Sequence, residues 1–321
     1  MSTIGNSSET AARILRQGGI VALPTETVYG LGGNALDVSA VAKIFAAKQR
    51  PEFDPLIVHV PDTEHARQYV THFPPLAERL AARFWPGPLT LVLPKRDIIP
   101  DLVTSGLPEV GLRVPAHPLM QQVLRLAELP IAAPSANLFG RISPTTAQHV
   151  AEQLADRVDY ILDGGPCAVG VESTVLQLTD KPRLLRPGGV SLEELESLIG
   201  PIEVVSSTDD PGRRAQVAPG MLPQHYAPNT PLQLIEPGTI PDTFPPEKRI
   251  GLLRFSNSAC LPVAAEEILA PTASDQTAAA NLFAALRRLD SLGLDLIIAE
   301  LLPEQGLGRA INDRLRRAAA R

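Results

Sequence analysis

The 321-residue sequence has little cysteine and few aromatic residues: two cysteines, one tryptophan and 4% aromatics in all. Cys167 and Cys260 lie far apart, so they match neither a metal-ligand spacing nor the disulfide framework of a secreted protein. No run approaches the ~20 consecutive apolar residues of a membrane helix, and residues 1–10 lack the charged and apolar regions of a signal peptide. These absences predict a soluble, cytoplasmic protein without a membrane partner.

The sequence also lacks an excess of positive charge, because its formal net charge is −6. Sequence-independent binding to nucleic acid depends on Lys and Arg that neutralise phosphates, so we expect no stable, direct binding to RNA. Only the C-terminus is locally basic, with Arg314, Arg316, Arg317 and Arg321. We interpret these residues as cations that complement a helix dipole and solubilise the chain end.

Familiar nucleotide-binding loops are missing as well. The sequence contains no Walker loop, and Gly306-Leu307-Gly308 lacks the third glycine of a dinucleotide fingerprint, so we expect it to open a helix. If the protein binds ATP, side chains and strand-end amides must therefore hold the phosphates. Four histidines show no metal-ligand spacing, and we predict no protein-bound metal site: His65, His72, His117 and His149.

The most informative stretch is residues 24–31, PTETVYGL, which follows the apolar residues 20–23 and precedes residues 48–51, KQRP. A short strand that ends at a proline and continues with two threonines, a glutamate and a glycine presents polar groups at a strand end. Such edges are where α/β proteins usually bind ligands. The cations Lys48 and Arg50 indicate that the ligand is anionic.

Helix and strand patterns alternate irregularly along residues 1–200, which we predict to form the first domain. The pattern favours the α/β class, with an open, twisted, mixed sheet covered by helices rather than a regular doubly wound sheet. We expect helices at 9–17, 39–48 with Ser39 as the N-cap, 64–70, 76–84, 119–126 and 147–154, a further helix after a capping box at 191–194, and strands at 20–23, 55–60, 89–93, 111–114, 131–133, 160–162 and 171–178.

The remaining sequence divides into two parts. Residues 201–247 are rich in proline and contain SSTDDPG, which leaves little room for regular structure, so we predict a linker. Residues 248–321 read as a small α/β domain, with strands at 250–254 and 294–300 and helices at 278–289 and 307–318.

Several polar residues stand where loops can aim them into a site. Arg113 and Arg186 resemble Lys48 and Arg50 in lying beside proline or glycine, and each could hold an anion. His59 lies between two valines, a setting more typical of a structural histidine. Small polar groups at the ends of apolar runs could contact phosphate, carboxylate or adenine, or could equally form turns and caps: Ser135, Asn137, Ser143, Ser173 and Thr174.

The PTETVYGL stretch resembles the signature of the threonylcarbamoyl-AMP synthases, a family of YrdC-like enzymes. Further segments keep the order seen in that family: PLIVHV at 55–60, WPGPLT at 85–90, GLRVP at 111–115, PSAN at 134–137, ESTV at 172–175 and LRPG at 185–188. The resemblance is strong over residues 8–200 and weaker towards the C-terminus, where PGM at 219–221 and HYAP at 225–228 are similar to the linker of the long, two-domain form.

This resemblance implies a set of site residues. ATP would be bound by Lys48, Arg50, Asp54, Ser135, Asn137, Ser143, Arg186 and Tyr226, and L-threonine by Thr27, His59, Arg113 and Ser173. Lys48 and Arg50 would be catalytic, stabilising charge together with Mg²⁺. Asp54 departs from the pattern, because the family often has Asn there. An ionised Asp54 can only accept hydrogen bonds, which favours a Mg²⁺-linked contact or an ion pair with Arg50 over direct phosphate binding.

The implied reaction joins L-threonine, bicarbonate and ATP into threonylcarbamoyl-AMP and releases pyrophosphate. The product would serve a downstream transferase complex that forms threonylcarbamoyladenosine in tRNA. Two alternatives remain open from the sequence. A carbamoyl-transfer enzyme of hydrogenase maturation shares the YrdC-like module, although it should also carry zinc-finger cysteines. A non-enzymatic RNA-binding module could use the same small basic concavity.

The HYAP motif leads to a separate hypothesis about residues 201–247. A structureless tether needs no such motif, because its reach depends mainly on length and stiffness. We therefore expect His225 and Tyr226 to fold over the first domain's site as a lid that excludes water. Alternatively, these residues only dock the two domains together.

Overall fold

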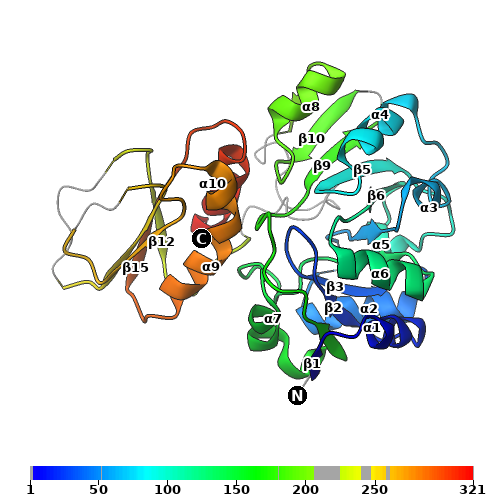
Figure 1. The fold of residues 1–321 in the computed structure, drawn as a ribbon, viewed down its shortest axis with the longest axis horizontal. Helices are drawn as coiled ribbons and strands as arrows, with labels where there is room; N and C mark the ends of the chain where they lie inside the picture. Colours follow the sequence, from blue (N-terminus) through cyan, green and yellow to red (C-terminus); the bar gives the residue numbers. More distant parts are fainter. Residues whose placement is uncertain are drawn as a thin grey trace.

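The computed structural model of the protein describes residues 3–51, 53–179, 181–205, 225–239, 247–257 and 261–320. Figure 1 shows a large α/β unit built from the N-terminal two thirds of the chain and a smaller one built from the C-terminal part. The described part of the chain contains no helix with both the length and the apolar character needed to cross a membrane.

The large unit is organised around a mixed sheet of eleven strands in the order β1-β8-β2-β3-β7-β4-β6-β5-β9-β10-β11. The sheet contains both parallel pairs, such as β4 with β6, and antiparallel pairs, such as β5 with β6, which confirms the mixed α/β fold expected from the sequence. The strands are β1 (Thr3–Gly5), β2 (Val21–Leu23), β3 (Gly30–Asn34), β4 (Ile57–His59), β5 (Leu89–Pro94), β6 (Glu109–Arg113), β7 (Ile131–Ala132), β8 (Tyr160–Leu162), β9 (Thr174–Leu178), β10 (Pro182–Arg186) and β11 (Glu203–Val204).

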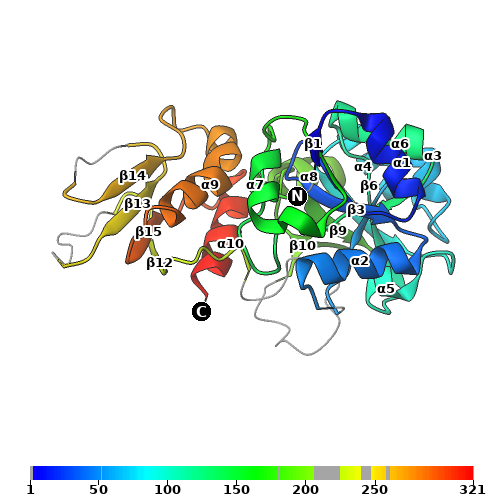
Figure 2. The same cartoon turned by 90° about the horizontal axis from the view of Figure 1, so that it is seen from below.

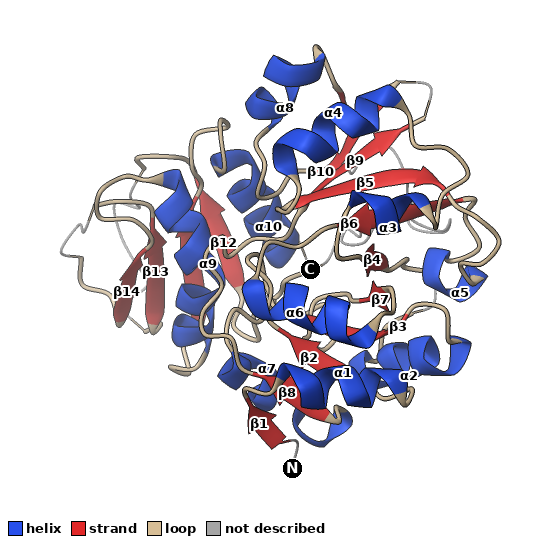
Figure 3. Cartoon of the chain, turned by 45° about the vertical axis from the view of Figure 1, so that its right-hand side comes forward, coloured by secondary structure: helices blue, strands red, loops and turns tan. Residues whose placement is uncertain are grey.

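Helices cover this sheet, as Figure 3 shows. They are α1 (Ser8–Arg16), α2 (Val38–Lys48), α3 (Thr63–Arg67), α4 (Pro75–Phe84), α5 (Asp101–Thr104), α6 (Pro118–Ala127), α7 (Ala147–Leu154), followed by the 3-10 turn Ala155–Arg157, and α8 (Leu192–Ile199). Their apolar faces bury a core rich in Ala, Leu, Val and Ile against the strands.

Helix ends follow local sequence signals. The predicted capping box of α8 is present, with Ser191 and Glu194 each bonded to the other's backbone amide. For α2 the predicted N-cap is wrong: Asp37 fills that position, and its carboxylate accepts a hydrogen bond from Ser39 N at 2.9 Å. The helix ends at Lys48, because Gln49 adopts a left-handed conformation with φ 53°. Lys48 therefore lies in the last turn and Arg50 in the following loop, as expected.

Strand β3 was missed from the sequence because Gly30-Leu31-Gly32-Gly33-Asn34 has low strand propensity. Packing explains its glycines, since a Cβ at Gly32 would lie 2.6 Å from Leu23 Cδ1 and 2.9 Å from Ile131 Cγ2. The strand lies between β2 and β7 because its glycines allow the side chains of these neighbours to approach closely, and not because its residues favour strand structure.

The small unit has a parallel, four-stranded sheet in the order β12-β15-β13-β14. Its elements are β12 (Leu232–Ile235), β13 (Ile250–Arg254), β14 (Ala265–Ile268), α9 (Asp275–Asp290), β15 (Leu296–Glu300) and α10 (Gly308–Ala319). Gly308 opens α10, as predicted. The expectation that 201–247 lacks regular structure needs correction, because β11 and β12 both lie within it. Proline masks β12 in the sequence, yet Pro231 only precedes the strand and interrupts no ladder.

Helices α9 and α10 lie between the small sheet and the large unit (Figures 1 and 2). One apolar cluster crosses the boundary, in which Val28, Ile142 and Val171 of the large unit join the buried residues of α9 and α10. Tyr226 belongs to the same cluster, and its ring stacks on Phe283 of α9 at a centroid distance of 5.6 Å. The two units thus share a buried apolar interface.

Candidate functional site

A cavity of about 50 Å³ lies where loops and strand ends of the large sheet converge. The loop after β2, the start of β3, the strands β4 and β6, the segment after β7, the segment before β9 and the end of β10 all contribute to it. Six residues predicted to bind substrate line this cavity: Thr27, His59, Arg113, Ser135, Ser173 and Arg186. The structure therefore brings together residues that are spread over 160 positions of the sequence.

The loop after β2 is held by its own hydroxyl groups. Thr25 Oγ1 donates to Val28 O at 2.6 Å and accepts the amide hydrogens of Thr27 and Val28, each at 3.2 Å. Thr25 Oγ1 and Thr27 Oγ1 are 2.8 Å apart. Because the Thr25 hydroxyl hydrogen is directed to Val28, Thr27 donates in this pair. Thr27 therefore keeps its acceptor lone pairs for the cavity.

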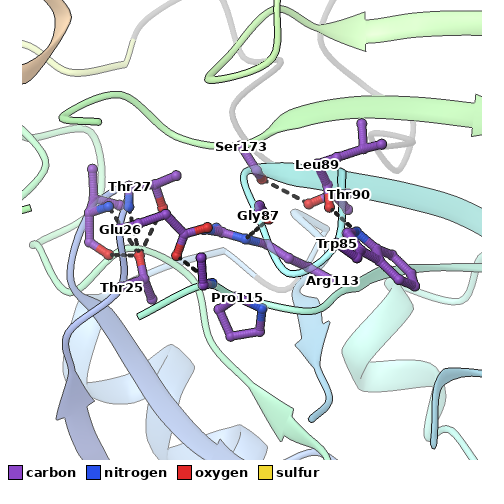
Figure 4. A network of polar contacts seen from close by, with 12 residues as sticks. Thr25, Glu26, Thr27, Trp85, Gly87, Leu89, Thr90, Arg113, Pro115 and Ser173 are labelled. Atoms are coloured by element: carbon purple, nitrogen blue, oxygen red, sulfur yellow. Dashed lines mark hydrogen bonds and ion pairs between the residues drawn. The ribbon is translucent and has the colours of Figure 1, made fainter. Parts of the chain in front are cut away.

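Arg113 bridges the two sides of the site, as Figure 4 shows. Its Nη2 lies 2.7 Å from Glu26 Oε1, and its Nε donates to Gly87 O at 3.3 Å. The second oxygen of Glu26 accepts a hydrogen bond from Ala116 N at 3.0 Å. Arg113 is only 4% exposed. The guanidinium is thus fixed in place before any ligand binds.

His59 is buried and neutral. Burial, followed by the nearby Arg113, lowers the pKa of His59 to about 3. Its Nδ1 makes no hydrogen bond among the residues that the structure describes. A neutral imidazole can exchange a hydrogen bond with a polar substrate group without adding charge.

A second group of predicted residues lies behind the cavity wall. Lys48 Nζ donates to the carbonyl oxygens of Ser135 and Asn137, the latter at 2.6 Å. Arg50 Nη2 is 2.9 Å from Asp54 Oδ2, so the ion pair expected as an alternative to direct phosphate binding is present. Asp54 Oδ1 has no hydrogen-bond partner among the described residues.

Lys48 and Arg50 are far more buried than their place at a helix end suggested, with exposed fractions of 1% and 7%. Burial, followed by the charge of Arg50, holds the pKa of Lys48 well below its ordinary value. An ammonium group in this setting gains strongly from a nearby anion, because the anion offsets the cost of its desolvation.

Arg186 and Ser173 line the cavity and contact each other. Arg186 Nη2 donates to Ser173 O at 2.9 Å and lies 3.3 Å from Ser173 Oγ. The hydroxyl of Ser173 is also 2.8 Å from Thr90 Oγ1 (Figure 4). The end of β10 and the start of β9 are therefore fixed to one another at the cavity.

Asn137 and Ser143 do not line the cavity. The amide nitrogen of Asn137 donates to Leu138 O and Arg141 O, while its Oδ1 has no hydrogen-bond partner in the described part of the chain. Ser143 donates to Glu172 Oε1 at 2.6 Å, and Glu172 does line the cavity. Both residues stand one contact away from the site.

The segment at residues 225–228 docks against the large unit. Ala227 N donates to Gly140 O at 2.8 Å, and the His225 ring meets Phe139 edge-on at 5.8 Å. His225 and Tyr226 are almost fully buried, with 4% and 1% exposure. The cations Arg50 and Lys48 are near enough to His225 to lower its pKa, after the larger effect of burial. The related PGM motif at 219–221 lies outside the described residues.

The interpretation of the C-terminal arginines needs correction. Arg314 is fully buried and Arg317 is 7% exposed, so neither solubilises the chain end. Arg314 Nε pairs with Glu172 Oε2 at 2.9 Å, and Arg317 Nε pairs with Asp313 Oδ1 at 2.9 Å. Burial of these arginines becomes favourable only where the helix contacts the rest of the folded protein. The sequence of one helix does not show which of its faces makes that contact.

Sequence reasoning assigned no role to three further residues of the site. Thr25 and Glu172 line the cavity, and Glu26 holds Arg113. All three lie inside the PTETVYGL and ESTV segments, next to residues that were predicted to belong to the site. This neighbouring position is the feature of the sequence that could have identified them.

Among the described residues, no group of three or more His, Cys, Asp and Glu side chains is placed to hold a metal ion. Asp54 and Glu172 are acidic groups close enough to Lys48 to influence its pKa. Asp54 Oδ2 is paired with Arg50, whereas Asp54 Oδ1 lacks a hydrogen-bond partner within those same ranges.

Comparison with known families matches both units of the chain. Residues 13–188 match the family described as Telomere recombination (Sua5_yciO_yrdC). Residues 190–320 match the family described as Threonylcarbamoyl-AMP synthase, C-terminal domain.

Similar proteins extend over nearly the whole chain. The threonylcarbamoyl-AMP synthase of Pyrococcus abyssi is 44% identical, over 96% of this chain and 93% of that protein. The enzyme of the same name from Bacillus subtilis is 44% identical, over 99% and 94% respectively. A crystal structure of P. abyssi Sua5 in complex with L-threonine superposes with a TM-score of 0.91 at 41% identity, covering 99% of this chain and 98% of that one. On these matches, the chain belongs to the threonylcarbamoyl-AMP synthase family in its two-domain form.

Proposed function

We propose that this protein makes threonylcarbamoyl-AMP from L-threonine, bicarbonate and ATP and releases pyrophosphate. The observation that carries the proposal is one cavity lined by hydroxyl groups, an imidazole and the cations Arg113 and Arg186, with the buried cations Lys48 and Arg50 behind its wall. The family to which the chain belongs supports the same reaction. The product would then be consumed by a transferase that modifies tRNA.

L-Threonine would occupy the side formed by Thr27, His59, Arg113 and Ser173. Arg113 offers a fixed guanidinium for the carboxylate, and the acceptor lone pairs of Thr27 suit the substrate's amine. Because His59 is neutral, it does not compete with the substrate's own charges. The placement is supported by the lining of the cavity.

The triphosphate would lie against the cations Lys48, Arg50 and Arg186. Ser135 would lie beside these cations and also contact the nucleotide. ATP carries several negative charges, and desolvated cations stabilise such charge far better than exposed ones. Asn137, Ser143 and Tyr226 would support the nucleotide from the next layer, where hydrogen bonds and packing hold them.

Mg²⁺ would enter with ATP rather than reside in the protein. It is typically bound by one or two carboxylates together with substrate phosphates. Asp54 Oδ1 fits such a role, because it is buried next to Arg50 and lacks a hydrogen-bond partner among the described residues. When bound, the ion would supply further charge neutralisation at the phosphates.

The chemistry needs no protein nucleophile. The threonine ammonium group first loses a proton, and the resulting amine combines with bicarbonate to form a carbamate and water. A carbamate oxygen then bonds to the α-phosphorus of ATP while the bond to pyrophosphate breaks. The protein's residues would position the two substrates and stabilise charge on the leaving pyrophosphate.

A substrate-omission assay tests the proposal. Pyrophosphate release should require ATP, L-threonine and bicarbonate together, because the attacking carbamate forms only from the last two. L-Serine and L-valine serve as matched controls for the pocket. Pyrophosphate release at an unchanged rate without threonine would contradict the proposed reaction.

The buried Lys48 gives a pH prediction. Its pKa is lowered in the free protein, first by burial and then by Arg50, and bound phosphates would raise it again. ATP binding should therefore take up a proton at pH values between the free and bound pKa, and ATP affinity should fall as pH rises through that window. Calorimetry at alkaline pH, in buffers of different ionisation enthalpy, measures this uptake away from the phosphate's own titration near about 6. Identical uptake in Lys48→Met would assign the proton to another group.

A further inference from the structure

The C-terminal unit contributes one fully buried cation to the surroundings of the site. Arg314, in α10, has no exposed surface, and its Nε lies 2.9 Å from Glu172 Oε2. Glu172 precedes Ser173 in the chain and lines the cavity together with Arg186. The ion pair thus crosses the interface between the two units and ends at the cavity.

Glu172 is bonded through both carboxylate oxygens. Oε2 faces Arg314, and Oε1 accepts the hydroxyl hydrogen of Ser143 at 2.6 Å. Its backbone is also tightly packed, because a Cβ at Gly188 would lie only 2.4 Å from Glu172 O and from Ser173 C. Glu172 is therefore held in place through both its side chain and its backbone.

Arg314 is held by three other partners. Its Nη1 donates to Pro187 O at 2.7 Å and to Asp313 Oδ2 at 2.9 Å. Its guanidinium carbon lies 5.4 Å from the centre of the Tyr226 ring. One side chain of the C-terminal unit therefore contacts the loop after β10, the 225–228 segment and a cavity-lining carboxylate.

The electrostatic consequence concerns Arg186. Glu172 is a buried anion, and the cations close enough to influence it include both Arg314 and Arg186. While Arg314 neutralises Glu172, Arg186 keeps its bonds to Ser173 and remains positioned at the cavity. Without Arg314, the uncompensated carboxylate would draw Arg186 towards itself, because a buried charge without a partner is strongly unfavourable.

We propose that Arg314 is a positioning residue for ATP, which neutralises Glu172 so that Arg186 keeps its position at the cavity only when the C-terminal unit is docked. The inference rests on the proposed placement of ATP against Arg186. It assigns the C-terminal unit a direct part in completing the nucleotide site, in addition to any part played by residues 225–228.

The test compares Arg314→Met with Arg316→Met in the full-length protein. Arg316 lies in the same helix, is about half exposed and pairs with Glu304 on the surface, so it controls for loss of charge from α10. We expect Arg314→Met to weaken ATP binding by about tenfold or more, within the range of couplings between sites. Binding of L-threonine, measured by calorimetry without ATP, should change little in either variant.

A double variant separates charge neutralisation from simple packing. Adding Glu172→Gln to Arg314→Met removes the orphaned charge and keeps the side-chain volume, so ATP affinity should recover in large part. A purely structural role for Arg314 would leave the double variant as weak as the single one. Arg314→Lys, which keeps the charge, should fall between wild type and Arg314→Met, and it replaces the methionine variant if that one does not fold.

Two outcomes would overturn the inference: ATP affinity of Arg314→Met and Arg314→Lys equal to that of Arg316→Met, or no recovery in the double variant. Failure of the proposed function is distinguishable from either. In that case the wild-type protein would release no threonine-dependent pyrophosphate, whereas the comparison of ATP affinities would still be measurable.

Discussion

Replacing Lys48 with methionine should lower kcat/KM for ATP by about a hundredfold or more, as expected when a preorganised charge is removed from a transition state. Lys48 is buried, and its ammonium is held by the carbonyl oxygens of Ser135 and Asn137 behind the cavity wall. Arg50→Ala should have an effect of similar size, because Arg50 is a second buried cation of the proposed phosphate site and is paired with Asp54.

The matched control is Lys43→Met in the same helix, since Lys43 is exposed and only its contact with Gly18 O is lost. Thermal melting of each variant gives the cost to folding. Lys48 and Arg50 lie at a helix end, but both are buried. We expect Lys48→Met to cost about 1–3 kcal/mol, because two buried carbonyl oxygens lose their donor. If the turnover of either variant stays within a few-fold of wild type, the substituted residue does not bind the phosphates.

The fold was largely predictable because most of its elements carry local signals. The α8 capping box, the end of α2 at Lys48 and the strand Ile250–Arg254 follow from caps, apolar runs and turn residues. Strand β3 did not follow, because its glycines are required by the close approach of Leu23 and Ile131. Such a requirement exists only after the neighbouring strands are in place.

The site was predictable in part for the same reason. Thr27, His59 and Arg113 occupy motif positions at strand ends, and the fold brings them to one cavity. Arg314 was misread, because a helix sequence shows which residues are charged but not which face another domain covers. The burial of Lys48 was likewise hidden, since it depends on residues 135–137 of a distant segment.

The docked 225–228 segment raises the question of how ATP enters. A cavity of about 50 Å³ is much smaller than the ~300–1,000 Å³ of typical ligand pockets, so a nucleotide requires movement at the site. Tyr226 lies against Arg314 at the junction of the two units, and Arg50 is close enough to His225 to lower its pKa. We infer that this segment acts as a lid, which opens to admit ATP and then shields the mixed anhydride product from water.

The full-length variant His225→Ala with Tyr226→Ala tests this inference. We expect it to bind ATP but to consume more ATP per product formed, because water reaches the anhydride. The ratio of pyrophosphate released to threonylcarbamoyl-AMP recovered measures this directly. A chain ending near Gly200 should show a larger defect of the same kind. It would also lose β11 and expose Val28, Ile142 and Val171, so the point variant is the cleaner test.

Phe283→Leu provides the control for docking. Phe283 stacks on Tyr226 from α9, so its replacement weakens the contact between the units without removing either lid side chain. If the segment serves only to dock the units, Phe283→Leu and the double alanine variant should lower stability together and leave the ratio of pyrophosphate to product unchanged. A lid predicts that the ratio rises in the double alanine variant beyond any change in Phe283→Leu, because the rings that close over the site are then missing.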